Sequence, residues 1–316
     1  MSCEPPPAKR QRNEDEPITR SEMWNSDGSV ILQAENTQFR VHWSVLARHS
    51  SIFSDMQELP QPADQSNVDG CPVVELSDDP KDVEYLLKAL YIPQKTLPLS
   101  AVGAIIRLGR KYDFKDLFDS AVARLMSKCP STLEAYVLYD PLRTTDNAFE
   151  LYDALEFDIV ALASENKILS ALPCVYFHLI NNFELSYLFD EIRRPDGTVA
   201  RLPSLDLQRC VVAREKLLAK QFQEGYTLGW ARKWPFDDCA KSRCRTKRES
   251  IMNWYLEDSE LAALEPPTRI GGGFDQLCTV CTKHATESTV AGRKKVWEEL
   301  PSFFDLPPWT ELKSGM

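Results

Sequence analysis

Four cysteines near the end of the chain are the residues best suited to do chemistry. Cys239 and Cys244 are separated by four residues, and Cys278 and Cys281 by two. A short loop lets two thiolates converge on one ion, and two such pairs supply the four soft ligands of a tetrahedral zinc site. The spacing therefore predicts a structural zinc site at these cysteines, with His284 as an alternative ligand in place of one of them.

Free thiols and redox chemistry are the alternatives to a zinc site at these cysteines. The gap between the pairs is longer than in compact zinc fingers, and unpaired cysteine is among the most buried residue types, so free thiols in a core fit the pattern as well. A redox role for Cys278 and Cys281 would need a helix within a βαβ unit, which the pattern does not predict. The chain has nine cysteines, and inside a cell they are expected as free thiols or metal ligands rather than disulfides.

Basic side chains crowd the segment around the first cysteine pair. They are Lys241, Arg243, Arg245, Lys247 and Arg248. A solvated charged face is the default interpretation, and the alternative is a zinc-dependent nuclear regulator that contacts DNA or RNA through this loop. The net charge of −10 argues against general attraction to nucleic acid or to acidic membrane surfaces.

Signatures of enzymes are missing from the sequence. It has no G-x-S-x-G, no phosphate-binding loop that ends in Gly-Lys-Ser/Thr, and no G-x-G-x-x-G after a strand, and Gly271–Gly273 lead into no lysine. We therefore predict no catalytic residue and no cofactor other than structural zinc, and we expect a protein that is not an enzyme.

Composition favours an intracellular protein with two domains. A chain of 316 residues with 43% hydrophobic and 27% charged residues is long enough for two packed cores. The longest apolar run, Ala171–Ile180, is about half the roughly 20 residues that a membrane-spanning helix needs. The first residues lack the apolar stretch of a secretory signal. Residues 7–12 resemble a short nuclear import signal, so both nucleus and cytoplasm are candidate locations.

The amino-terminal part changes character near residue 23. Residues 1–22 are rich in proline and charge with little to bury, which predicts a disordered tail. Two short strands, Ser29–Ala34 and Thr37–Val41, then flank a polar turn, and apolar residues at helical spacing follow them. A short strand is expected over Val73–Leu76.

Helices are predicted for most of the chain beyond that strand. Asp79 and Pro80 supply a helix cap and a first-turn proline in the favoured order. Further helices are predicted from about Ser100 and around Leu117, and Cys129-Pro130 marks their end. Residues 131–316 are predicted to be a mainly helical region.

The order of residues after the hairpin is that of a known family. An aromatic residue, a histidine, a Val-Leu pair and a Ser-x-x-Phe follow in turn, at Phe39, His42, Val45, Leu46, Ser50 and Phe53. This pattern resembles the opening of a BTB (POZ) domain, and Asp27, Tyr91 and Lys111-Tyr112 also stand where the family has such residues. The resemblance implies an α+β fold over residues 23–130, with a small sheet flanked by helices.

The BTB resemblance also implies a function in protein binding. Such domains bind proteins: they often dimerise, or dock on cullin-type ubiquitin ligase scaffolds as substrate adaptors. Residues 13–26 are mostly polar, whereas members that dimerise by exchanging strands carry an apolar helix there, so that dimer mode is not expected. We predict a non-enzymatic adaptor with protein partners, either a second copy or a cullin scaffold.

The closing segment, residues 293–309, resembles the end of many fungal BTB proteins. Those proteins commonly pair a BTB domain with a cysteine-bearing helical region. In this chain Pro301 is predicted to end a helix, and an extended aromatic strap is predicted to follow it.

Overall fold

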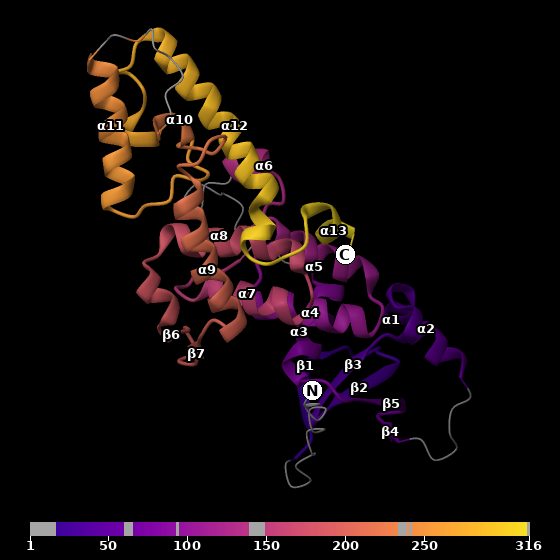
Figure 1. Ribbon diagram of the computed structural model, residues 1–316. Helices are drawn as coiled ribbons and strands as arrows, with labels where there is room; N and C mark the ends of the chain where they lie inside the picture. Colours follow the sequence, from indigo (N-terminus) through magenta and orange to yellow (C-terminus); the bar gives the residue numbers. More distant parts are fainter. Residues whose placement is uncertain are drawn as a thin grey trace, which may run out of the picture. The chain divides into compact units, whose positions relative to one another are not determined.

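The computed structural model describes residues 17–59, 66–92, 95–138, 149–232, 239 and 242–314. The chain divides into two compact units. The amino-terminal unit comprises residues 1–124 and 147–150, and the carboxyl-terminal unit comprises residues 125–146 and 151–316. Figure 1 colours the chain from indigo at its start to yellow at its end.

The amino-terminal unit contains a five-stranded sheet in the order β1-β3-β2-β5-β4. Its strands are β1 (Thr19–Trp24), β2 (Val30–Ala34), β3 (Thr37–Val41), β4 (Asn67–Val68) and β5 (Cys71–Leu76). The predicted hairpin is confirmed, because β2 and β3 pair antiparallel around a turn in which Glu35 has a φ of 47°. β2 also pairs parallel with β5 and is buried along its whole length.

The prediction of a disordered tail over residues 1–22 is wrong at its end. Residues 1–16 lie outside the described residues, but Thr19–Trp24 form β1, which pairs parallel with β3. Met23 is the buried side chain of this edge strand, and the others are exposed or half-buried. Most side chains of this edge strand are polar, as they would be in a disordered tail. The sequence pattern therefore does not distinguish the two.

Two short helices, α1 (Trp43–His49) and α2 (Ser51–Glu58), follow the hairpin. Ser50 stands between them and begins α2, because its hydroxyl accepts the N–H of Phe53 at 3.1 Å. The same hydroxyl donates to the carbonyl of Tyr112. Ser50 is buried, so one side chain both caps α2 and ties it to a residue far along the chain.

Three longer helices follow: α3 (Pro80–Tyr91), α4 (Leu99–Lys111) and α5 (Lys115–Met126), which lies in the amino-terminal unit up to its last two residues. The predicted start of α3 is confirmed, since the Asp79 carboxylate accepts the Lys81 N–H at 2.9 Å. Phe39, Leu46 and Phe53 share one hydrophobic core. Burying each such side chain contributes about 1.5–3 kcal/mol, so these residues specify the fold.

The carboxyl-terminal unit is mainly helical, as predicted. Its α-helices are α6 (Leu133–Leu138), α7 (Leu155–Glu165), α8 (Leu172–Asn182), α9 (Ser204–Lys220), α10 (Gly229–Arg232), α11 (Ser242–Glu257), α12 (Thr279–Phe303) and α13 (Trp309–Ser314). Three 3-10 turns, η1 (Leu169–Ala171), η2 (Leu185–Phe189) and η3 (Ile270–Gly272), and the strand pair β6 (Ile192–Arg193) and β7 (Val199–Ala200) connect them. None of the described helices is both long enough and apolar enough to cross a membrane.

Helix α10 packs against both α11 and α12, which Figure 1 shows as orange and yellow ribbons. Gly292 lets α12 approach the segment before α10, because an added Cβ would lie 2.5 Å from the backbone nitrogen of Thr227. The indole N–H of Trp230 on α10 donates to the hydroxyl of Thr289 on α12 at 3.1 Å. This hydrogen bond is buried, so it fixes the relative position of the two helices.

The prediction that Pro301 ends a helix is wrong. Helix α12 continues through Pro301 to Phe303. Proline has no N–H to donate to the carbonyl four residues earlier, which is that of Trp297. The indole N–H of Trp309 donates to this carbonyl at 2.7 Å instead, and the two indole rings stack with centroids 5.4 Å apart. The replacement donor accounts for the helix's tolerance of the proline.

Replacing Ser50 with alanine should destabilise the amino-terminal unit. The change removes the cap of α2 and leaves the Tyr112 carbonyl without this donor, and together these losses should cost about 1–3 kcal/mol. Hydrogen exchange of α1 and α2 in increasing urea measures the change. Ser44→Ala, at an exposed position of α1, is the matched control, and equal stability of the two variants would contradict the assigned role.

Trp309→Phe tests the replacement donor in α12. The phenyl ring keeps most of the stacking but lacks the N–H, so a loss of about 1–2 kcal/mol in the free energy of unfolding is expected. Pro301→Ala restores a backbone donor for the Trp297 carbonyl. In that background the cost of Trp309→Phe should shrink, and a double-mutant cycle with no coupling would argue against the role assigned to the indole.

Candidate functional site

The structure brings the four predicted cysteines together in the carboxyl-terminal unit. Cys239 precedes α11, and Cys244 lies in its first turn. Cys278 is the N-cap residue of α12, and Cys281 lies in the first turn of that helix. The amino ends of two helices therefore present one cysteine pair each.

The sulfur atoms form a compact group. All four lie within 4.8 Å of one another, and those of Cys239 and Cys278 are 3.9 Å apart. Tetrahedral zinc with bonds of about 2.3 Å would hold its sulfur ligands about 3.8 Å apart. The four thiols are thus positioned to bind a metal ion. His284, the alternative ligand, is not among the converging residues.

Backbone N–H groups point at two of the sulfur atoms. The N–H of Cys278 donates to the Cys244 sulfur at 3.2 Å. The N–H of Cys281 donates to the Cys278 sulfur and lowers the pKa of Cys278 to about 6. Burial raises the pKa of Cys244 and of Cys281. A cation between them would offset this cost of burial, because metal-bound thiols lose their protons.

The four converging cysteines pack in or against one apolar cluster. Cys244 and Cys281 are buried in it, and Cys239 and Cys278 are half-buried at its edge. Ile251 of α11 packs on Gly271, where an added Cβ would lie 2.5 Å from the isoleucine side chain. The cluster fixes α11 against η3, so the sulfur positions follow from packing as well as from any bound ion.

The remaining described cysteines are buried thiols. Cys71, Cys129, Cys174 and Cys210 are all buried and have no disulfide partner among the described residues. Burial raises the pKa of Cys129 and of Cys210 to about 12. Cys129 and Cys210 therefore stay protonated at neutral pH and make poor nucleophiles or metal ligands.

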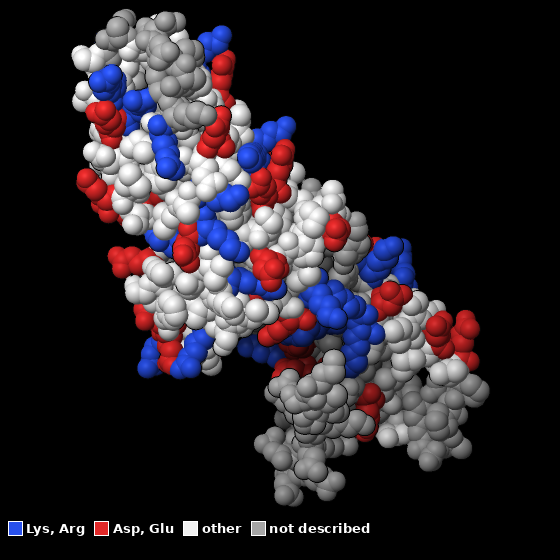
Figure 2. Space-filling model, viewed as in Figure 1, with Lys and Arg blue, Asp and Glu red and all other residues white. Residues whose placement is uncertain are grey.

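The basic segment near the cysteines lies on helix α11 rather than in a loop. Lys241 falls outside the described residues, and Arg243 and Arg245 are exposed. The ammonium group of Lys247 donates to the carbonyl of Gly271 at 2.7 Å, so it serves the fold. On the face that Figure 2 shows, basic and acidic side chains are interspersed. The described residues of this segment give no support for contact with nucleic acid.

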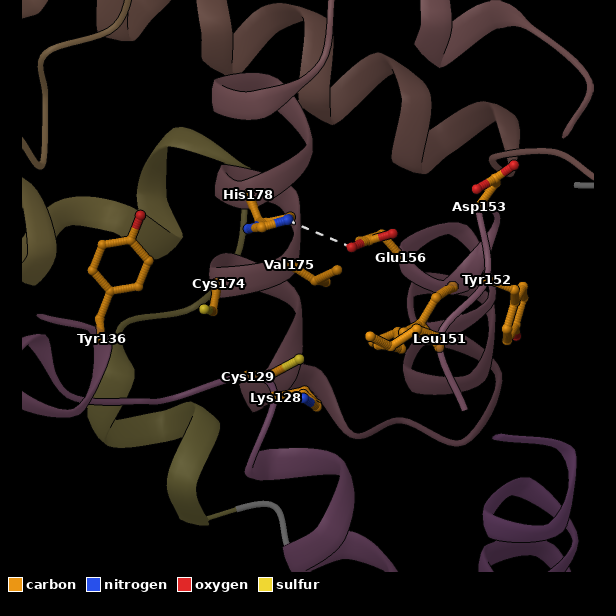
Figure 3. Close-up of a pocket in the computed structure, with 12 residues that line it drawn as sticks. Lys128, Cys129, Tyr136, Leu151, Tyr152, Asp153, Glu156, Cys174, Val175 and His178 are labelled. Atoms are coloured by element: carbon orange, nitrogen blue, oxygen red, sulfur yellow. Dashed lines mark ion pairs between the residues drawn. The ribbon is translucent and has the colours of Figure 1, made fainter. Parts of the chain in front are cut away.

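A cavity that the sequence did not reveal lies beside α7 and α8. It has a volume of about 330 Å3, and Figure 3 shows Cys129, Cys174 and His178 in its lining. His178 pairs with Glu156 at 3.5 Å. Burial raises the pKa of both cysteines, which keeps them protonated. The arrangement lacks an activated nucleophile, so it is a poor candidate for a cysteine active site.

In the amino-terminal unit, three residues of the predicted family pattern form one hydrogen-bonded chain. The imidazole Nε2 of His42 lies 3.2 Å from the carboxylate of Asp27, and its Nδ1 lies 3.1 Å from the hydroxyl of Tyr91. The Tyr91 hydroxyl also accepts the backbone N–H of His42. Hydrogen bonding to His42 lowers the pKa of Asp27. These contacts tie the end of β3 to α3, so the pattern maintains the framework.

The surface of the amino-terminal unit includes an apolar groove beside α3 and α5. Its volume is about 480 Å3, and Leu90, Ile92 and Leu117 are among its lining residues. Ile92 is 52% exposed although it is large and apolar. Lys88, Asp116 and further polar residues complete the lining. An apolar groove with charged edges suits contact with a protein side chain.

Comparison with known proteins agrees with this description of the amino-terminal unit. Residues 24–128 match the model of the BTB/POZ domain family. No curated protein matches the chain. The matched region contains β2–β5 and α1–α5, with the Asp27–His42–Tyr91 chain inside it. We conclude that this protein carries a BTB/POZ domain, a small sheet flanked by helices, which is followed by a mainly helical region.

Proposed function

We propose that the protein is a non-enzymatic adaptor that grips another protein through its BTB domain. The match over residues 24–128 carries this proposal, because BTB domains are protein-interaction modules. The hydrogen-bonded chain of Asp27, His42 and Tyr91 supports it, since the polar residues of the family pattern serve packing rather than a reaction. Fold alone does not determine function, so the proposal also needs a surface for the contact. The apolar groove of the amino-terminal unit provides one.

The groove beside α3 and α5 is the proposed contact surface. Ile92 and Leu90 present apolar area there, and Lys88 and Asp116 can fix the orientation of a partner. The partner is either a second copy of this chain or a cullin-type ubiquitin ligase scaffold. In the second case the carboxyl-terminal unit would hold the protein to be modified.

Ile92→Asp should weaken the contact at least about tenfold, because a charge would be buried in an apolar contact that one anchor residue can dominate. Sedimentation velocity of the full chain measures self-association, and calorimetry with a purified cullin amino-terminal region measures docking. Leu205→Asp, at an exposed leucine of α9 in the other unit, is the control and should leave binding unchanged. A full chain that stays monomeric at about 100 µM and binds no cullin would contradict the adaptor proposal.

We further propose that Cys239, Cys244, Cys278 and Cys281 hold a structural zinc ion. The convergence of four sulfur atoms within 4.8 Å supports this proposal, and two backbone N–H donors to sulfur support it further. Four protein ligands leave no open coordination position, which is typical of structural rather than catalytic zinc. The ion would stabilise the junction of α11 and α12.

The zinc proposal predicts about one zinc ion per chain in protein purified without chelators. Cys278→Ser and Cys244→Ser should each lose most of that metal, and chelation should increase hydrogen exchange in α11 and in the first turns of α12. Metal analysis of the intact protein measures the stoichiometry.

Cys210→Ala provides the control for the zinc experiment, because Cys210 is a buried cysteine of the same unit that lies outside the cluster. This variant should keep its zinc even if it is less stable. Folded protein that contains no zinc, and whose hydrogen exchange does not respond to chelators, would overturn the assignment.

A further inference from the structure

A second cavity in the carboxyl-terminal unit has a lining of unusual charge. It has a volume of about 570 Å3, within the range of about 300–1,000 Å3 of ligand sites. Two guanidinium groups, Arg214 and Arg269, and two carboxylates, Glu260 and Glu265, line it. No salt bridge joins any of these four residues to another in the described part of the chain.

Two of these charged groups each leave a buried atom without a partner. The Nε of Arg214 and the Oε2 of Glu265 are buried and have no hydrogen-bond partner among the described residues. Another nitrogen of Arg214 donates to the carbonyl of Ser259 at 3.1 Å, so the guanidinium is held in place. Both side chains are only half-buried, so the polar atoms that a ligand could reach are their remaining ones rather than these two.

The remaining wall is apolar and aromatic. Ile180 and Phe183 at the end of α8 and Trp254 and Tyr255 on α11 supply most of it. Trp254 is 55% exposed, and its indole N–H donates to the Glu260 carboxylate at 3.0 Å. An exposed indole that holds a carboxylate at a cavity wall places an apolar face and an anionic acceptor side by side.

The loop that carries the two carboxylates is fixed from within the fold. The side-chain amide of Gln221 donates to the carbonyl of Glu260 at 3.0 Å, and its oxygen accepts the N–H of Ala262 at 2.8 Å. Gly272 borders the cavity, and a Cβ added there would meet no atom within 4 Å. The charged groups are therefore held in advance around an open space, which lowers the cost of binding.

We propose that this cavity binds a free α-amino acid with an apolar side chain. The charges of its lining balance, which favours a ligand that carries both charges over a simple anion or cation. An α-amino acid offers a carboxylate to Arg214, an ammonium group to Glu265 and a side chain to the aromatic wall. A peptide terminus carries only one of the two charges. The site is separate from the cysteine cluster and from the BTB domain, and it goes beyond the adaptor proposal.

The test is calorimetry and saturation-transfer NMR on the full chain with L-leucine and L-phenylalanine as probes. Two blocked compounds, N-acetyl-L-phenylalanine and L-phenylalaninamide, lack the ammonium and the carboxylate charge respectively. Each blocked compound should bind about 10- to 100-fold more weakly than L-phenylalanine, the factor expected for one charge-assisted hydrogen bond.

Variants show whether each charge meets the expected residue. The Glu265→Gln variant should bind N-acetyl-L-phenylalanine about as well as it binds L-phenylalanine, because the partner of the ammonium group is gone. The Arg214→Gln variant should likewise bind L-phenylalaninamide about as well as L-phenylalanine. Trp254→Ala removes an exposed part of the aromatic wall, so it should weaken binding of both amino acids while disturbing the fold less than a change at a buried residue would. Glu287→Gln and Arg245→Gln, at exposed positions outside the cavity, are the matched controls and should bind as the wild type does.

Absence of binding by both amino acids at about 10 mM would overturn the proposal, and the cavity would then be filled by solvent only. Equal binding by the wild type and by Glu265→Gln and Arg214→Gln would overturn it too. Zinc content and cullin binding are measured on the same samples, so a failure here is distinguishable from a failure of the adaptor or zinc proposals.

Discussion

The meeting of the amino ends of α11 and α12 is the constraint on which the carboxyl-terminal unit depends. Cys244 and Cys278 lie 34 residues apart in sequence, yet a backbone N–H of one reaches the sulfur of the other. In the apolar cluster next to these cysteines, Ile251 of α11 packs on Gly271, which has no room for a side chain. The four sulfur atoms converge where this packing holds the ends of the two helices together. A bound ion would then reinforce a junction that the apolar cluster has already aligned.

Local patterns in the sequence predicted the local parts of the fold. Two short runs around a polar turn predicted β2 and β3, and the Asp79-Pro80 pair predicted the first residue of α3, because both signals act over a few residues. Strand β1 was missed because Met23 is its one buried side chain, and a single apolar residue gives no strand pattern in the sequence. Pro301 was misjudged because its compensating donor, Trp309, lies on a later helix that no local pattern connects to it.

The candidate sites differ in the same way. The convergence of the four cysteines could be predicted because two short spacings each bring two thiols together, whatever fold joins the pairs. The charged cavity could not, since its lining comes from α8, α9, α11 and the segment before η3 with no common spacing. Its clearest sign is that two arginines and two glutamates line one cavity, which only the folded chain reveals.

Helix α11 takes part in both sites of the carboxyl-terminal unit. Its first turn carries Cys244, and near its end Trp254 and Tyr255 form part of the cavity wall. The indole of Trp254 holds the Glu260 carboxylate, so the two sites are built on opposite ends of the same helix. The BTB domain needs no such connection, because its core of Phe39, Leu46 and Phe53 is complete within its own unit.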